Sequence, residues 1–262
     1  MSLESQRRSA SHRQEDITRF ILEQGTATIA DISSAFGVSV MTVHRDLNEL
    51  SRQGIVRKFR GGASALPSGV FESSVRFRLS SMVEAKEAIA AEAHSIIEPG
   101  MSILLDEGTT TLALARMLAD IAPLTVITSY LETIKVLTGF KDTRLISLGG
   151  EYRSNHDSFI GVQCIAALEA MRTDIAFLST SAVGEGAAYH QEQEIVLVKR
   201  AMMASASKRI LLVDHSKLMT SALHRFAQLS EFDLLITDDG LSKEQREDLV
   251  NHAVQFRLAP LG

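Results

Sequence analysis

A glycine and three hydroxyl side chains stand together in residues 106–111, which read Asp-Glu-Gly-Thr-Thr-Thr. This string follows the apolar run 103–105 and comes directly before a stretch with helical spacing. Glycine lets the backbone turn closely, and the free amides at a helix N-terminus favour an anion such as phosphate. The string therefore predicts an anion-binding loop, and a helix cap without a ligand is an alternative of equal weight.

Small and charged residues follow other apolar runs in the same way. Residues 147–150 read Ser-Leu-Gly-Gly, residues 179–184 read Ser-Thr-Ser-Ala-Val-Gly, and residues 214–217 read Asp-His-Ser-Lys. We expect Lys217 to pair with a phosphate, and a surface lysine in a loop is the plainer alternative. Asp106 or Asp214 would accept hydrogen bonds from sugar hydroxyls. The predicted ligand-binding residues are Asp106, Gly108, Thr109, Thr110, Thr111, Gly149, Gly150, Ser181, Asp214 and Lys217.

A basic cluster marks the first part of the chain. Arg52, Arg57, Lys58 and Arg60 fall within nine residues that contain no acidic side chain. The whole chain carries a net charge of −5. Residues 1–63 nevertheless hold nine lysines and arginines against seven aspartates and glutamates, a net charge of +2. Such a local excess suits nucleic-acid phosphates, whereas a solvated charge cluster is the usual alternative.

The elements before this cluster favour the first interpretation. Helical spacing predicts helices over residues 13–24 and 29–36, with Gly25 ending the first and Thr28 capping the second. After a glycine turn, Ser39 caps a third helix that runs to about residue 52.

The third helix has one apolar face and one polar face. Val43, Leu47 and Leu50 follow i, i+4, i+7 spacing and must face inward. A helix, a tight turn, a polar third helix and a basic hairpin over residues 55–62 are typical of a winged helix-turn-helix. A protein-interaction module of three helices is the alternative. The predicted DNA-binding residues are Ser39, Val40, Thr42, His44, Arg45, Arg57, Lys58 and Arg60.

The rest of the chain alternates between apolar runs and helical stretches. Continuous apolar strands separated by helices predict a mostly parallel, Rossmann-like α/β sheet covered on both faces. Ligands bind such sheets outside the carboxyl ends of the strands. We therefore expect a DNA-binding domain in residues 1–63, a linker in 64–81 and an effector-binding α/β domain in 82–262. The predicted strands span residues 103–106, 124–128, 145–148, 175–180, 210–214 and 234–237.

Composition limits the remaining classes. No apolar run approaches the roughly 20 residues that span a bilayer, and the polar first residues lack a secretory signal, so we expect a cytoplasmic protein without a membrane partner. Cys164 is the only cysteine, so we expect a buried thiol and neither an intramolecular disulfide nor a cysteine-based zinc site. The scattered histidines match no metal pattern, so we expect no metal and no cofactor.

The motifs resemble those of the DeoR family of bacterial regulators. The resemblance rests on residues 38–47 with Gly54 and residues 61–63, on residues 106–111 and on residues 214–217. His44 stands where the family usually has an arginine, and Leu218-Met219 replace a common aromatic-glycine pair. The resemblance implies an effector domain similar in fold to sugar-phosphate isomerases, and a sugar phosphate or related metabolite that relieves repression.

Two further functions compete with a regulator. The second domain could be an active isomerase or lyase, because carboxylates and His215 are available for acid–base work. The first domain could serve a pure protein-interaction adaptor. The fused DNA-binding module favours a sensor over an enzyme, and a regulator of this kind acts as at least a dimer on paired operator half-sites.

Overall fold

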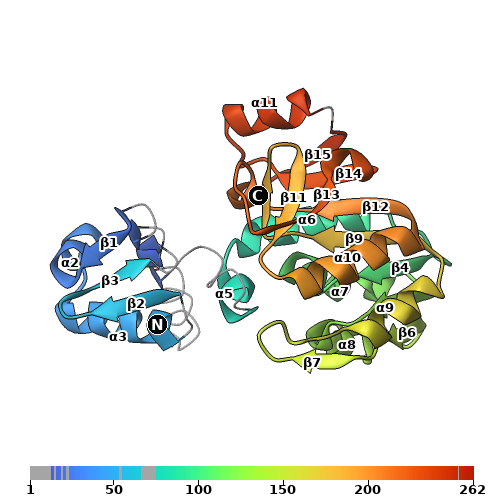
Figure 1. Ribbon diagram of the computed structural model, residues 1–262, viewed down its shortest axis with the longest axis horizontal. Coiled ribbons are helices and arrows are strands. Elements are labelled where there is room, and N and C mark those ends of the chain that lie inside the picture. The colour runs from blue at the N-terminus through green and yellow to red at the C-terminus, as the bar shows by residue number, and fades with distance from the viewer. Residues whose placement is uncertain are drawn as a thin grey trace. The chain divides into compact units, whose positions relative to one another are not determined.

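The computed structural model describes residues 13–14, 16–18, 20–21, 24–52, 55–65, 75–252 and 254–262. The chain divides into two compact units, Met1–Ser81 and Met82–Gly262 (Figure 1). Gly54 and half of the predicted linker, residues 66–74, lie outside the described residues. Within the predicted linker the structure has a short helix, α5 (Val75–Ser80).

The helices of the first unit agree with the predicted pattern. All described residues between 13 and 24 are helical. Helix α2 (Ile29–Phe36) begins with a capping box, in which the Thr28 hydroxyl accepts from the Asp31 amide at 3.1 Å and the Asp31 carboxylate accepts from the Thr28 amide at 3.0 Å. Helix α3 spans Val40–Arg52.

A small antiparallel sheet completes this unit. Its strands are β1 (Thr26–Thr28), β2 (Val56–Phe59) and β3 (Gly62–Ala65), in the order β1-β3-β2. Gly62 must be glycine because a Cβ there would overlap the carbonyl of Ala27. Strand β1 was not predicted, since three residues carry no readable alternation. The core of the unit contains Ile17, Ile21, Ala27, Ile32, Val43, Leu47, Leu50, Ile55, Val56 and Ala63.

The second unit is built on a seven-stranded parallel sheet, which confirms the predicted α/β class. Its strand order is β15-β14-β12-β9-β4-β5-β6. Each predicted strand corresponds to one of these, and β15 was not predicted. The strands are β4 (Ser102–Leu105), β5 (Leu124–Thr128), β6 (Thr143–Ser147), β9 (Thr173–Ser179), β12 (Ala206–Leu212), β14 (Leu234–Asp238) and β15 (Phe256–Ala259).

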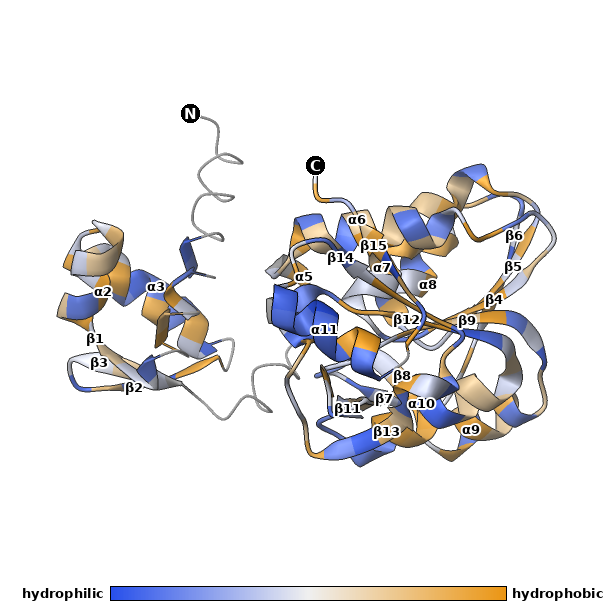
Figure 2. Ribbon diagram, turned by 90° about the horizontal axis from the view of Figure 1, so that it is seen from above, coloured by the Kyte–Doolittle hydropathy of each residue, from blue (hydrophilic) through white to orange (hydrophobic). Residues whose placement is uncertain are grey.

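Helices cover both faces of this sheet (Figures 1 and 2). In β4, Ile103 and Leu105 pack into one cluster of buried residues and Leu104 into another. This alternation recurs in β9 and β12, and it explains why the strands read as unbroken apolar runs. The helices are α6 (Val83–His94), α7 (Thr109–Met117), α8 (Leu131–Leu137), α9 (Val162–Glu169), α10 (Gln193–Ser205) and α11 (Lys243–Asn251).

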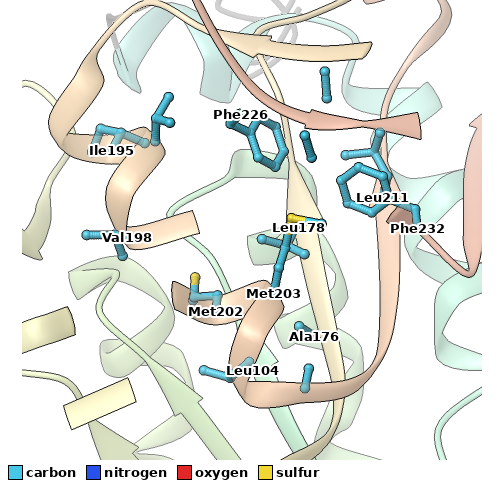
Figure 3. Packing of buried hydrophobic residues seen from close by; sticks show 14 of the residues in the cluster. Leu104, Ala176, Leu178, Ile195, Val198, Met202, Met203, Leu211, Phe226 and Phe232 are labelled. Carbon is cyan, nitrogen blue, oxygen red and sulfur yellow. The ribbon is translucent and has the colours of Figure 1, made fainter. Parts of the chain in front are cut away.

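One of the two clusters lies between the sheet and the helices α9 and α10. Figure 3 shows Met202 and Met203 of α10 with Leu178 of β9 and Leu211 of β12. By contrast, α11 is largely hydrophilic in Figure 2 and buries only Leu249. In the part of the chain that the structure describes, no helix has the length and apolar character needed to cross a membrane.

Two small antiparallel sheets flank the main sheet and were not predicted. Their strands are three to five residues long, and β13 joins β11 across more than thirty residues of sequence. Pairing over such a distance leaves no local signal for β13, and the other strands are too short to show a readable alternation. One sheet contains β10 (Ala182–Gly184), β11 (Ala187–His190) and β13 (His224–Gln228), and the other contains β7 (Glu151–Arg153) and β8 (Ser158–Ile160).

Candidate functional site

The exposed face of α3 carries the residues predicted to contact DNA. Ser39 caps the helix, because its hydroxyl accepts from the Thr42 amide at 3.2 Å. Val40, His44 and Arg45 are exposed, while Val43 on the opposite face is fully buried. This is the arrangement of a recognition helix, whose first turns reach base edges in the major groove.

Strands β2 and β3 form the predicted wing. Arg57 is exposed on β2, and Arg60 is exposed in the turn that Gly61 makes with a φ of 93°. Lys58 lies on the other face of β2, and its ammonium donates to the side chain of Asn48 on α3. The wing and the recognition helix therefore present their polar groups together.

A buried carboxylate that was not among the predicted functional residues fixes α3 within the unit. Asp46 is 1% exposed and accepts from Arg13 Nε at 2.7 Å and from Gln14 Nε2 at 3.0 Å. The available signal in the sequence was that Asp46 directly precedes Leu47, a residue of the apolar stripe of α3. Asp46 is thus a positioning residue for the DNA-contacting face.

In the second unit the predicted ligand residues follow strands β4, β6, β9 and β12 at the carboxyl edge of the sheet. The chain order reverses between β4 and β9, which is where ligands bind in open α/β sheets. Helix α7 begins here at Thr109, and its N-cap residue, Gly108, supplies no side-chain cap. The amides of its first turn are therefore left for another acceptor.

Asp106 is fully buried, and its carboxylate is saturated by protein donors. It accepts from the Ser179 amide at 2.6 Å, from the Thr111 hydroxyl at 2.9 Å and from Lys199 Nζ at 2.5 Å. Gly108 must be glycine because a Cβ there would overlap the Ser179 hydroxyl. Asp106 and Thr111 therefore hold the loop in shape, rather than presenting polar groups to a ligand.

Lys199 is the main residue of this edge that sequence reasoning missed. It lies on the buried face of α10, at i+4 from Ile195, and a lysine among apolar neighbours at that spacing was the available signal. Its ammonium is 1% exposed and also lies 2.9 Å from Glu107 Oε1. Burial lowers the pKa of Lys199, but the two carboxylates outweigh burial and hold its pKa above the ordinary value.

Glu107 belongs to the same buried network. Burial is the largest single effect and raises the pKa of Glu107, but the charge and hydrogen bond of Lys199, with smaller contributions from the backbone and His156, together hold the pKa below its ordinary value. Cys164 is buried as predicted, and burial together with the Glu107 charge raises the pKa of its thiol to about 11. A thiol in this state is a poor nucleophile at neutral pH, so Cys164 serves the core.

Thr109 and Thr110 are placed differently from Thr111. Both lie in the first turn of α7, and they are 8% and 5% exposed. Within the described residues, neither hydroxyl has a hydrogen-bond partner. Ser181 is half-buried, and its amide donates to the Tyr189 carbonyl at 3.2 Å.

Gly149 and Gly150 lie at the far side of the sheet. Strand β6 is separated from β12 by four inter-strand steps, about 19 Å at the usual spacing. Gly150 has a φ of 145°, and a Cβ there would overlap the carbonyl of Ile160. This geometry favours a structural role for the pair, in the turn that leads into β7.

The turn after β12 carries Asp214 and Lys217. Asp214 is 3% exposed and caps the turn by accepting from the Ser216 amide at 3.1 Å. Lys217 is half-buried. Met219 has a left-handed backbone with a φ of 59°, a conformation that glycine adopts without strain.

His215 stands beside Lys217 and was not among the predicted ligand residues. Its Nδ1 lies 2.5 Å from Oδ2 of Asp238, a fully buried side chain at the end of β14. Burial raises the pKa of Asp238, but the hydrogen bonds from His215 outweigh burial and hold the pKa low. Asp238 is thus ionised at neutral pH and fixes the imidazole. Among the described residues, no group of three histidine, cysteine or acidic side chains is arranged to hold a metal ion.

Comparison with known proteins agrees with this geometry. A model of the DeoR-like helix-turn-helix domain matches residues 13–68, and a model of the DeoR C terminal sensor domain matches residues 81–239. The glycerol-3-phosphate regulon repressor of Escherichia coli (strain K12) is 30% identical, over 95% of this chain and 98% of that protein. The lactose phosphotransferase system repressor of Staphylococcus aureus (strain NCTC 8325 / PS 47) is 31% identical, over 86% of this chain and 91% of that protein.

A D-ribose-5-phosphate isomerase, solved in complex with phospho-erythronic acid, aligns with 51% of this chain and 52% of its own, at 19% identity and a TM-score of 0.38.

The two units therefore define a transcription regulator with a DNA-binding module and a sensor domain. The chain belongs to the DeoR family. The expectations of a regulator, of a helix-turn-helix module and of a sensor rather than an enzyme are confirmed by this membership.

Proposed function

We propose that the chain is a repressor of carbohydrate genes, released from or retained on its operator by a phosphorylated sugar or polyol. The recognition helix α3 and the wing bind operator DNA. The effector binds at the carboxyl edge of the parallel sheet, where the loop before α7 lies two strand positions from the turn that carries Lys217.

The uncapped N-terminus of α7 carries the proposal. Gly108 provides no side-chain acceptor, so the first-turn amides remain for an anion. The hydroxyls of Thr109 and Thr110 lack a protein partner within the described residues and can donate to the same group. The helix dipole adds a partial positive charge at this point.

The geometry also refines the proposed role of each residue. Thr109, Thr110 and Lys217 contact the ligand, with Ser181 at the margin. Asp106 acts as a positioning residue that anchors the loop through Ser179 and Lys199, because its oxygens are already taken.

The names of relatives support this class of effector. One is a repressor of a glycerol-3-phosphate regulon and another of a lactose phosphotransferase system. Both names refer to carbohydrate or polyol metabolism that involves phosphate. We further propose a cytoplasmic location. We also propose at least a dimer, because helix-turn-helix proteins bind paired half-sites.

A thermal-shift and gel-shift pair tests the proposal. The purified chain is screened against sugar and polyol phosphates and against the same compounds without phosphate. A ligand at 100 times its dissociation constant adds about 2.7 kcal/mol to the stability of the folded state. Without its phosphate the compound binds far more weakly, because charge-assisted contacts are lost.

Two variants localise the effect. Thr110→Val and Lys217→Ala are expected to lose the thermal shift and the ligand's effect on DNA, while binding DNA normally without ligand. Thr125→Val and Lys141→Ala, both at the amino ends of strands, serve as matched controls and keep the shift. Tight binding that survives both site substitutions places the effector elsewhere.

A further inference from the structure

A groove lined by three arginines lies in the second unit, outside the predicted effector residues. It has a volume of about 370 Å³ and is formed by residues of α10, β12, β13 and the turn after β13. Arg200 comes from α10, Arg209 from β12 and Arg225 from β13. We propose that this groove is a second binding site, which takes a small oxyanion such as a phosphate or carboxylate group of a metabolite.

The groove is distinct from the carboxyl edge. Arg209 lies three residues before the end of β12, about 10 Å along the strand. Asp233, which accepts from the Arg209 amide at 2.7 Å, directly precedes β14. The groove therefore faces toward the amino ends of these strands, and none of its lining residues belongs to the predicted effector set.

Its arginines are held in place by the protein. Arg200 donates from Nε to the Phe226 carbonyl and from Nη2 to the Arg225 carbonyl, both at 2.9 Å. Arg225 Nη1 donates to the Gln228 side chain at 3.0 Å when that amide is oriented to satisfy its hydrogen bonds. Each guanidinium carries five N–H donors, so most of them remain for a ligand. Fixed donors bind an anion with little loss of side-chain entropy.

Arg209 supplies an independent indication. Its Nη1 donates to the Glu231 carbonyl at 3.3 Å, whereas its buried Nε has no hydrogen-bond partner among the described residues. The nearest carboxylate oxygen, on Asp233, is 3.8 Å from that Nε. An N–H inside a protein is unfavourable without a partner, so the protein leaves the hydrogen-bonding capacity of Arg209 partly unused.

The charge of the groove also selects an anion. Three arginines line it against one carboxylate, that of Glu231. The unit around it is acidic, with sixteen lysines and arginines against twenty-four aspartates and glutamates in residues 82–262. Met203 and Phe226 add an apolar floor, which suits a small organic anion. Arginine forks bind phosphate and carboxylate groups through paired N–H donors.

The test uses inorganic phosphate as the probe and then succinate, so that phosphate binding and carboxylate binding are measured separately. The experiment uses the full chain with Lys217→Ala, which weakens the proposed effector site and leaves the groove intact. Calorimetry is expected to show one remaining phosphate site. Arg225→Gln is expected to lower its affinity at least tenfold, whereas Arg257→Gln, an exposed arginine that pairs with Glu92, leaves it unchanged.

Nitrogen-15 spectra of the arginine side chains give a second readout. The side-chain signals of Arg209 and Arg225 are expected to shift on addition of phosphate, because both guanidinium groups line the groove. The proposal fails if no phosphate binds in the Lys217→Ala chain, if Arg225→Gln binds it as before, or if about 0.15 M chloride displaces it. Lys217 is replaced in every chain of this experiment. A negative result would therefore not count against the effector proposal.

Discussion

Replacing Lys199 by methionine removes the ammonium that lies between two buried carboxylates. Lys199, Asp106 and Glu107 are each 2% exposed or less, and the ammonium lies 2.5 Å and 2.9 Å from the two acids. Methionine has a similar volume, so the change is mainly electrostatic. Breaking a buried ion pair in this way costs about 3–5 kcal/mol. Because domains have about 5–15 kcal/mol of stability in total, we expect the variant to fold marginally.

The loss should depend on pH in a defined direction. In the native protein, the pKa of Glu107 lies below 4.5 and the pKa of Lys199 lies above 10.5. The stabilisation from this ion pair is therefore lost only when the pH falls below 4.5 and Glu107 becomes protonated, or when the pH rises above 10.5 and Lys199 loses its proton. Without Lys199, burial raises the pKa of Glu107. Protonation of Glu107 then removes the unpaired charge. The difference in the free energy of unfolding between the variant and the native chain therefore becomes smaller as the pH falls from about 8 to about 5.

Tyrosine fluorescence during denaturant unfolding measures the stability of the second unit, which contains Lys199. All three tyrosines, Tyr130, Tyr152 and Tyr189, lie in the second unit, and the chain has no tryptophan. Lys135→Met breaks an exposed pair with Glu132 and serves as the control, with an expected loss of at most about 1 kcal/mol.

A second substitution separates charge from packing. Adding Glu107→Gln to Lys199→Met should restore part of the lost stability, because one of the two unpaired charges is gone. A loss below about 1 kcal/mol for Lys199→Met, or a loss that does not change with pH, would refute the account of a buried charge network.

Three other changes have definite expected results. Arg45→Ala should weaken operator binding by about 1–3 kcal/mol and relax the preferred sequence, as measured by gel shift on operator variants. Lys58→Ala should weaken binding to all sequences alike and reduce the salt slope of the affinity by about one; an unchanged slope would mean that its bond to Asn48 is purely structural. Met219→Gly should raise the stability by up to about 1 kcal/mol in thermal unfolding, because glycine adopts a φ of 59° without strain.

Local patterns were sufficient for the main elements. Thr28, Gly37 and Ser39 mark the ends of α2 and α3 because caps and left-handed turns depend on neighbouring backbone groups. The apolar run at 103–105 predicts a strand covered on both faces, and the structure places its alternate side chains in two separate clusters. Regular periodicity is a property of short segments, and so the sequence shows it.

The contacts that shape the two sites are not local. Asp46 pairs with Arg13 across 33 residues, and Asp106 pairs with Lys199 across 93. The string 106–111 indicates an anion-binding loop, yet no pattern in it shows that the side chains of Asp106 and Thr111 hydrogen-bond within the protein while the buried hydroxyls of Thr109 and Thr110 do not. That division depends on Ser179 and Lys199, which reach the loop from β9 and α10. A buried charge must find its partner through the folded chain, and the identity of that partner is therefore a property of the fold.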